Sequence, residues 1–208
     1  MYLVKTPKFM QAMWPAYTWS LPAAERVLYL TFDDGPIPEV TPWVLDTLRS
    51  FGAKATFFCV GDNVLRHPDV YAQVLAEGHT VGNHTFHHLN GWNTKPLPYL
   101  DNVRRCAEAV DSRLFRPPYG RLRPSQSRSL QQHFQIIMWD VLSGDFDQTI
   151  TPRQCLDNVL RYAGSGSIIV LHDSLKAEKN LHFVLPEVLK FFKEKGYCFE
   201  GMEGKAAL

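Results

Sequence analysis

Short apolar runs recur along this chain, and longer segments with helical periodicity separate them. The short runs are rich in β-branched and aromatic side chains, and they predict strands at residues 27–32, 55–60, 79–82, 113–116, 135–140, 167–171 and 197–199. The longer segments predict helices at 69–77, 97–111, 125–133 and 181–195, with two more that begin at Thr41 and Thr151. Strands that alternate with helices are typical of an α/β fold with a parallel sheet and right-handed crossovers.

Three of these helices carry a capping signal at their start. Thr41 and Thr151 each precede a proline, which predicts threonine as the N-cap and proline at the first helical position. The second of these helices is expected to run to about Tyr162. Asn180 is the predicted N-cap of the last long helix.

Polar side chains stand at the ends of five predicted strands. They are Asp33 and Asp34, His84 and His88, Arg116, Asp140 and Asp145, and His172 with Asp173. The C-terminal ends of parallel strands open on one face, where barrel enzymes carry their reactive groups. We therefore expect a β/α barrel, either closed or one strand short of closure, with an open doubly wound sheet as the alternative.

The composition predicts one domain. The 208 residues are 45% apolar and 12% aromatic, which is enough to bury a full core. We expect this domain to cover residues 26–208 and to be preceded by an extension, residues 1–25, that packs on it. A formal net charge of +1 gives no basic field for nucleic acid, and no apolar run approaches the length of a membrane span. Neither a nucleic-acid partner nor an integral membrane segment is therefore expected, and the oligomeric state is left open.

The first 24 residues and the cysteines bear on the cellular location. A small-residue pair at Ala23-Ala24 could pass for the cleavage site of a signal peptide, but Gln11 and Pro15 interrupt the apolar stretch that export needs. The four cysteines form no C-x-x-C pair and predict free thiols at Cys59, Cys106, Cys155 and Cys198. We favour a cytoplasmic protein, with an extracytoplasmic location and weak binding to a membrane surface as alternatives.

Two adjacent carboxylates and a group of histidines suggest a metal site. Asp33 and Asp34 repel each other unless a cation or a shared proton offsets their charge. His84 and His88 lie four residues apart, so on a helical turn both rings would face one way. Two histidines with one carboxylate form an open metal-site ligand set, and His84 with His87 is the alternative pair. The pattern predicts a metal hydrolase.

Four segments, in this order, resemble motifs of the polysaccharide deacetylases. This is carbohydrate esterase family four, which shares the nodulation-type chitooligosaccharide deacetylase domain. The segments are residues 31–36 (TFDDGP), 84–88 (HTFHH), 116–119 (RPPY) and 171–173 (LHD). The resemblance extends from about residue 26 to residue 199. It implies a distorted (β/α) barrel of about seven parallel strands.

The resemblance also implies a cofactor and its ligands. Asp34, His84 and His88 are expected to hold a divalent metal, usually zinc, with cobalt or nickel as alternatives. Water and substrate would complete the coordination. A bound metal lowers the pKa of water towards neutrality, which fits an attack on an acetamide carbonyl.

Five further roles follow from the same resemblance. Asp33 is expected to be the general base, with Arg116 beside it to keep it ionised and oriented. His172 is expected to be the general acid that protonates the departing amine. The backbone N–H of Tyr119 would contact the oxyanion, and Leu171 would line the pocket for the acetyl methyl group.

The fourth motif departs from the usual family pattern. The family places an Asp and, four residues later, a Trp where this chain has Leu142 and Phe146. Phe146 keeps an apolar wall but lacks the indole N–H. Because the usual Asp orients the catalytic histidine, His172 needs another partner. Asp145 is the first candidate and Asp140 is the second.

Together these features predict a metal-dependent hydrolase that removes N-acetyl groups from an amino sugar. The saccharide substrate would be a polymer, an oligomer or a lipid-linked form. One alternative keeps the metal and changes the substrate to a non-sugar amide or a cyclic imide. Another is a carbohydrate-binding domain without turnover, which the unusual Leu142 suggests.

Overall fold

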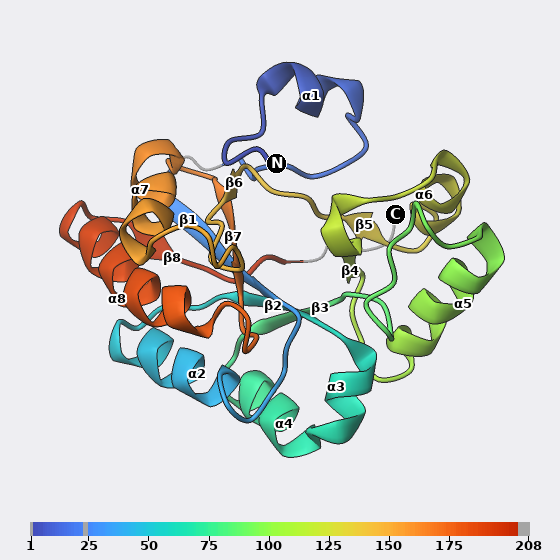
Figure 1. Ribbon diagram of the computed structural model, residues 1–208, viewed down its shortest axis with the longest axis horizontal. Helices are drawn as coiled ribbons and strands as arrows, with labels where there is room; N and C mark the ends of the chain where they lie inside the picture. The colour runs from blue at the N-terminus through green and yellow to red at the C-terminus, as the bar shows by residue number, and fades with distance from the viewer. Residues whose placement is uncertain (1, 23–24, 204–208) are drawn as a thin grey trace.

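The strands form one curled parallel sheet, and helices cover its outer face (Figure 1). The computed structural model describes residues 2–22 and 25–203. The strand order is β5-β4-β3-β2-β1-β7-β6, and β8 pairs with β1 beside this path. The strands are β1 (Val27–Asp33), β2 (Thr56–Cys59), β3 (Thr80–Asn83), β4 (Leu114–Phe115), β5 (Gln135–Ile136), β6 (Val141–Leu142), β7 (Ile168–His172) and β8 (Cys198–Phe199). The architecture is a distorted (β/α) barrel of about seven parallel strands, as the sequence predicts.

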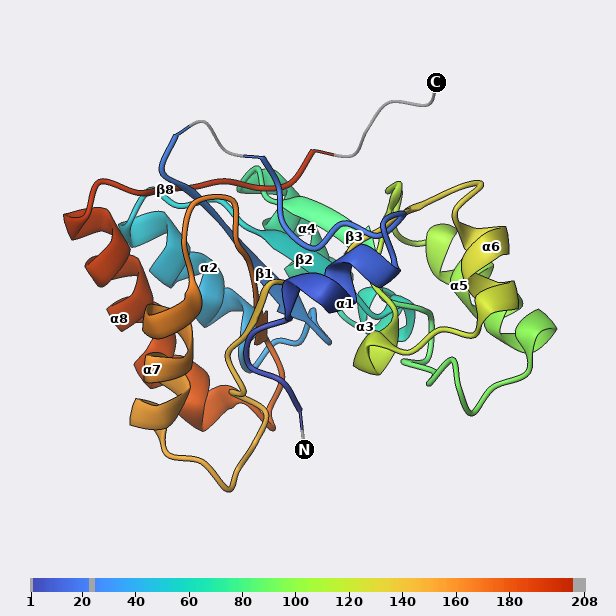
Figure 2. The same ribbon diagram turned by 90° about the horizontal axis from the view of Figure 1, so that it is seen from above.

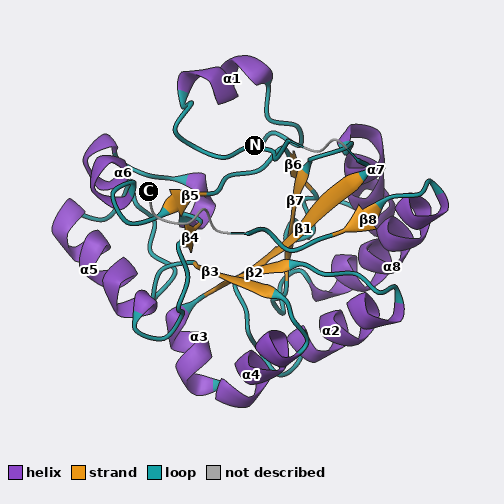
Figure 3. Cartoon of the chain, turned by 180° about the vertical axis from the view of Figure 1, so that it is seen from behind, coloured by secondary structure: helices purple, strands orange, loops and turns teal. Residues whose placement is uncertain are grey.

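Apart from α1, the helices lie on the outside of the curl and leave the strands at its centre (Figure 3). They are α1 (Lys8–Met13), α2 (Thr41–Ser50), α3 (Gly61–Arg66), α4 (Pro68–Ala76), α5 (Pro96–Ala107), α6 (Pro124–Leu130), α7 (Pro152–Tyr162) and α8 (Glu178–Glu194), with a short 3₁₀ segment at Pro118–Gly120. Within the described part of the chain, no helix is both long and apolar enough to cross a membrane.

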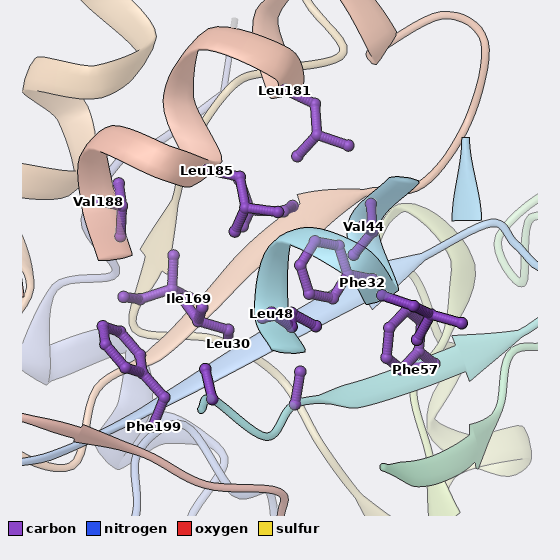
Figure 4. Packing of buried hydrophobic residues seen from close by; sticks show 14 of the residues in the cluster. Leu30, Phe32, Val44, Leu48, Phe57, Ile169, Leu181, Leu185, Val188 and Phe199 are labelled. Atoms are coloured by element: carbon purple, nitrogen blue, oxygen red, sulfur yellow. The ribbon is translucent and has the colours of Figure 1, made fainter. Parts of the chain in front are cut away.

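The main core lies between the sheet and the helices α2 and α8 (Figure 4). In β1, Leu30 and Phe32 point towards these helices, and the ring of Phe32 stacks on Phe57 with centroids 5.0 Å apart. Since successive side chains of a strand alternate between faces, Thr31 and Asp33 point to the inside of the curl. Burial of each large apolar side chain stabilises the fold by roughly 1.5–3 kcal/mol. This packing fixes the register that brings Asp33 to the inner face.

One predicted strand is wrong. Only the first two residues of the segment 135–140 form a strand, β5, at one edge of the sheet. The next strand, β6, begins after the segment and lies at the other edge. The residues between them, Ile137 to Asp140, cross the open side of the curl. An apolar run cannot reveal such a crossing, because all of these residues pack against neighbours whether or not they extend a strand.

The N-terminal segment lies across this open side (Figures 1 and 2). Lys5 forms a bridge with Val141, and further bridges join Thr18 to Ile137 and Ser20 to Ser167. The segment therefore contacts both edges of the sheet through its backbone. The pair Ala23-Ala24, considered above as a cleavage site, lies outside the described residues.

Two of the three predicted caps are wrong. Thr151 caps α7 and accepts a hydrogen bond from the backbone N–H of Gln154, as expected. Thr41 lies inside α2, which has Val40 at its N-cap position, and Asn180 lies inside α8, which has Ala177 there. Both side chains instead bond to loops at the C-terminal ends of the strands. The four cysteines are free, and all but Cys198 are buried.

Candidate active site

The reactive side chains meet at the C-terminal ends of the strands. Asp33 ends β1, and His172 ends the neighbouring strand β7 as its register partner. His84 directly follows β3, and Arg116 directly follows β4. Parallel strands present these ends to one face, so residues far apart in sequence come together there.

Asp34, His84 and His88 form a cluster with the geometry of a metal site. One ligand atom from each residue lies within 4.8 Å of the others. Oδ1 of Asp34 is 3.1 Å from Nε2 of His88 and 3.8 Å from Nε2 of His84. The expected helical turn between the histidines is wrong, because His84–His88 is a loop with positive φ at Thr85 and His88. The loop, rather than a helix face, brings the two rings together.

The protonation of His84 suits a metal ligand. Its Nδ1 lies 2.7 Å from the carbonyl oxygen of Arg116. Since a carbonyl can only accept, Nδ1 carries the proton and Nε2 offers its lone pair to the cluster. Burial is the main cause that lowers the pKa of His84, to about 4. The ring is therefore neutral at pH 7.

The carboxylate of Asp34 is ionised, and its Oδ1 has no hydrogen-bond partner among the described residues. Burial would raise the pKa of its carboxyl, but the rings of His88, His172 and His84 outweigh burial and lower it. Its Oδ1 is buried, and among the described residues no donor is aligned to bond it, although His88 is close. An ionised, buried and unpartnered oxygen beside two imidazole nitrogens fits a divalent cation such as zinc.

His87 is held away from this cluster. Its Nδ1 lies 2.9 Å from Nδ2 of Asn102, and its backbone N–H donates to Oδ1 of the same side chain. Asn102 also accepts from the backbone N–H of Phe86 at 2.8 Å. The alternative pair of His84 with His87 is therefore not the one that the structure brings to Asp34.

Asp33 and Arg116 form a buried ion pair. Nη1 of Arg116 lies 2.6 Å from Oδ1 of Asp33 and 2.7 Å from the hydroxyl of Thr31. The guanidinium is fully buried, donates to the carbonyl of Met138 and lies over the ring of Phe58 at 4.1 Å. With so many contacts the guanidinium has one position, and it fixes the direction of the Asp33 carboxylate.

His172 is held by Asp145. Oδ1 of Asp145 lies 2.7 Å from Nδ1 of the ring, and Oδ2 accepts the backbone N–H of His172 at 2.7 Å. Burial alone would lower the pKa of His172, but the carboxylates of Asp145, Asp34 and Asp33 raise it to about 9. Asp140, the second candidate for this role, instead accepts from Lys5 and Ser167 on the open side of the curl.

Asp173 follows His172 but faces the other way. Its carboxylate accepts from the hydroxyl of Thr41 at 2.7 Å and from the backbone N–H of Gly35 at 3.1 Å. Burial raises the pKa of this carboxyl to about 7. Through its bond to Gly35, Asp173 thus stabilises the loop that carries Asp34.

Tyr119 and Phe146 flank the centre. The ring centroids of Tyr119 and His88 lie 4.8 Å apart. Tyr119 is 60% exposed, and its backbone has a positive φ of 60°. The ring of Phe146 lies edge-on to His172, with centroids 5.1 Å apart. A pocket of about 340 Å³ beside Asp34 and His88 is lined by Val60, Asp62, Asn63 and His87 as well.

The structure places Leu171 away from the site. Leu171 is fully buried in the core cluster, and its register partner is Phe32, which faces the helices. Its side chain therefore lies on the face opposite to His172, and the expected contact with an acetyl methyl group is wrong. Val170, two residues before His172, has its side chain on the inner face and is buried.

Several supporting residues escaped the sequence interpretation. Thr31 and Asn102 lie inside a predicted strand and a predicted helix, and Thr41 and Asn180 were predicted only as helix caps. Their common signal is burial of a polar side chain, which only the tertiary structure reveals. Thr31 is the first residue of the motif at 31–36, but nothing in the sequence shows that its hydroxyl bonds to Arg116.

Two imidazoles and a carboxylate that could hold a cation lie beside the Asp33–Arg116 ion pair and His172 at the mouth of a half-barrel. This arrangement is typical of metal-dependent hydrolases. A family model described as polysaccharide deacetylase matches residues 20–136. The chain belongs to this family, whose deacetylases depend on a metal in general. It is accordingly a hydrolase that acts on carbon–nitrogen bonds of linear amides.

Known proteins of this family are similar over most of the chain. A peptidoglycan-N-acetylglucosamine deacetylase of Bacillus cereus is 35% identical over 189 residues, which cover 88% of this chain and 89% of that protein. A chitooligosaccharide deacetylase of Azorhizobium caulinodans is 35% identical over 156 residues, with 70% and 73% covered. The crystal structure of the Bc1960 peptidoglycan N-acetylglucosamine deacetylase has a TM-score of 0.86 at 30% identity, with 95% of each chain covered.

Proposed function

We propose that this protein removes N-acetyl groups from an N-acetylated amino sugar within a saccharide that is polymeric, oligomeric or lipid-linked. The cluster of Asp34, His84 and His88 beside the Asp33–Arg116 ion pair carries the proposal. The names of the similar proteins from Bacillus cereus and Azorhizobium caulinodans support a saccharide substrate. A cytoplasmic location stays a prediction from the sequence.

Asp34, His84 and His88 would hold the divalent cation, with zinc preferred by the donor set. A cation bound there would lower the pKa of a water and polarise the acetamide carbonyl. His84 contributes a neutral ring because its Nδ1–H bonds to the Arg116 carbonyl. Asp34 contributes the negative charge that balances part of the dication.

Asp33 is the proposed general base. Its Oδ1 is occupied by Arg116, and its Oδ2 lies 4.0 Å from Nε2 of His84, on the side of the metal ligands. Oδ2 is thus the oxygen that can take a proton from an attacking water. Arg116 prevents the carboxylate from rotating away.

His172 is the proposed general acid. Its raised pKa keeps the ring protonated at neutral pH, and its Nδ1–H is directed to Asp145. The proton on Nε2 is then the one available to a departing amine, which leaves poorly unless it is protonated. Asp145 orients the ring and stabilises its charge without touching the substrate.

The roles that we propose for the other residues around the site rest on where these residues lie. Tyr119 has a positive φ in the turn after Pro117-Pro118, and its backbone N–H is the proposed oxyanion donor. Phe146 forms an apolar side beside His172. Val170, rather than Leu171, is the residue of β7 that we propose for the acetyl methyl contact.

The test compares the wild type with Asp33→Asn. Acetate release from N-acetylated chitooligosaccharides and from peptidoglycan is measured in zinc-loaded protein, beside panels of simple amides and cyclic imides. We expect release from the glycans by the wild type and a loss of about 10²–10⁴-fold in kcat for the variant, with zinc content unchanged. Full activity of the variant would remove Asp33 as the base, and turnover of imides alone would overturn the sugar substrate.

A further inference from the structure

The N-terminal segment reaches the loop that carries the partner of His172. Residues 4–6 run antiparallel to residues 140–142: the N–H of Leu142 donates to the carbonyl of Val4, and the N–H of Thr6 donates to the carbonyl of Asp140. The segment pairs with the free edge of β6, the last strand on its side of the sheet. This pairing directs Tyr2 towards the loop beyond β6.

Tyr2 makes three contacts with that loop, residues 143–147. Its hydroxyl donates to Oδ2 of Asp147 at 3.0 Å. Its ring packs on the ring of Phe146, with centroids 5.1 Å apart at an angle of 57°. Its hydroxyl oxygen also lies only 2.7 Å from where a Cβ on Gly144 would be.

Gly144 permits this close approach in two ways. Its φ is +80°, a conformation that residues with a Cβ rarely adopt. A side chain there would also displace the Tyr2 hydroxyl. The glycine at this position therefore allows the loop to accept the Tyr2 side chain.

The same loop also contacts His172. The ring of Phe146 packs against both the Tyr2 ring and the His172 ring, with centroids 5.1 Å apart in each pair. Asp145 binds the His172 ring and also accepts the backbone N–H of Phe146 at 3.0 Å. From behind, Asn180 donates to the carbonyls of Asp145 and Asp147. A loop held at both flanks fixes the Asp145 carboxylate, and through it the His172 ring.

We infer that Tyr2 is a positioning residue for His172, because it holds the loop that carries Asp145 and Phe146. The catalytic side of this inference rests on the function proposed above. Tyr2 acts through Phe146 and Asp145: it restricts the loop, so the ring of His172 keeps the orientation that proton donation needs.

The experiment uses the full chain with zinc and three variants. Tyr2→Ala removes the ring and the hydroxyl, and Tyr2→Phe keeps the ring. Leu3→Ala is the matched control, because Leu3 is the next residue of the segment and is 52% exposed. Since Phe146 packs against both Tyr2 and His172, we expect Tyr2→Ala to lower kcat about tenfold with little change in KM and zinc content. Tyr2→Phe should recover most of kcat, and Leu3→Ala should match the wild type.

A second measurement does not depend on activity. The backbone N–H groups of Phe146 and His172 both donate to Asp145, so their hydrogen exchange reports the order of the loop. We expect Tyr2→Ala to speed the exchange of both at least about tenfold relative to Ile169 in β7, whereas Leu3→Ala does not. Unchanged exchange in Tyr2→Ala would overturn the inference. Faster exchange in a protein that releases no acetate would uphold the loop contact and overturn only the proposed function.

Discussion

The carboxylate of Asp145 holds His172 through two different atoms of that residue. Oδ1 lies 2.7 Å from Nδ1 of the ring, and Oδ2 accepts the backbone N–H at the same distance. One residue therefore sets both the direction of the ring and its place at the end of β7. This explains how the site retains an oriented histidine although the usual acidic position of the fourth motif is Leu142.

Replacing Asp145 by Asn should change the titration of His172. The pKa of about 9 is raised above 6.5 by Asp145 against the effect of burial, so the variant's pKa should fall towards or below 6.5. Because the pKa is raised on folding, this pair stabilises the fold below pH 6.5, and the contribution is lost as the pH rises through 9. NMR titration of the ring in metal-free protein measures the change. Asp140→Asn is the control, since Asp140 pairs with Lys5 and should leave His172 at about 9.

The two neighbouring histidines should differ in their effect on metal binding. His88→Ala removes a proposed ligand and should weaken zinc binding by more than about a hundredfold, with loss of activity. His87→Ala should keep its zinc, because the His87 ring bonds to Asn102. Zinc titration of both variants and metal analysis after dialysis measure the difference. Equal loss of zinc in both would contradict the assignment of the ligands.

His79 should make the fold less stable in acid. Its Nδ1 accepts the backbone N–H of Ala55, its Nε2 has no partner among the described residues, and burial lowers its pKa to about 4. A lowered histidine pKa means that the unfolded chain takes up the proton first, so stability falls as the pH drops from 6.5 to 4. The loss is up to about 3 kcal/mol. Urea unfolding at several pH values should show a smaller acid loss in His79→Asn than in the wild type.

Two tyrosines should respond oppositely to the loss of their hydroxyls. The hydroxyl of Tyr99 is buried and has no partner in the described part of the chain, whereas that of Tyr17 donates to Ser127 at 2.7 Å. Tyr99→Phe should therefore leave stability unchanged or raise it by about 1 kcal/mol, because an unsatisfied polar group is removed. Tyr17→Phe should lower it by about 1 kcal/mol. Denaturant unfolding of both variants at pH 7 tests this difference.

The fold class could be predicted because strand and helix patterns are local properties of the chain. The apolar runs around β1 and β7 are distinct enough to predict both strands within one residue of their ends. The crossing between β5 and β6 could not be predicted, since its residues are apolar for a different reason: they lie over the open side of the curl. The caps at Thr41 and Asn180 failed because these side chains serve distant loops instead of their own helix ends.

The sequence by itself determined the family and the residues that could be reactive, because Asp33, Asp34, His84 and His88 lie in short motifs whose order is visible along the chain. The tertiary structure alone decided which of them meet and what holds them. His88 lies beside Asp34 and His84, whereas His87 bonds to Asn102. Asp145, and not Asp140, bonds to His172, and Leu171 packs in the core. These choices depend on strand register and loop geometry, which bring together groups 15 or more residues apart, and no local pattern specifies such contacts.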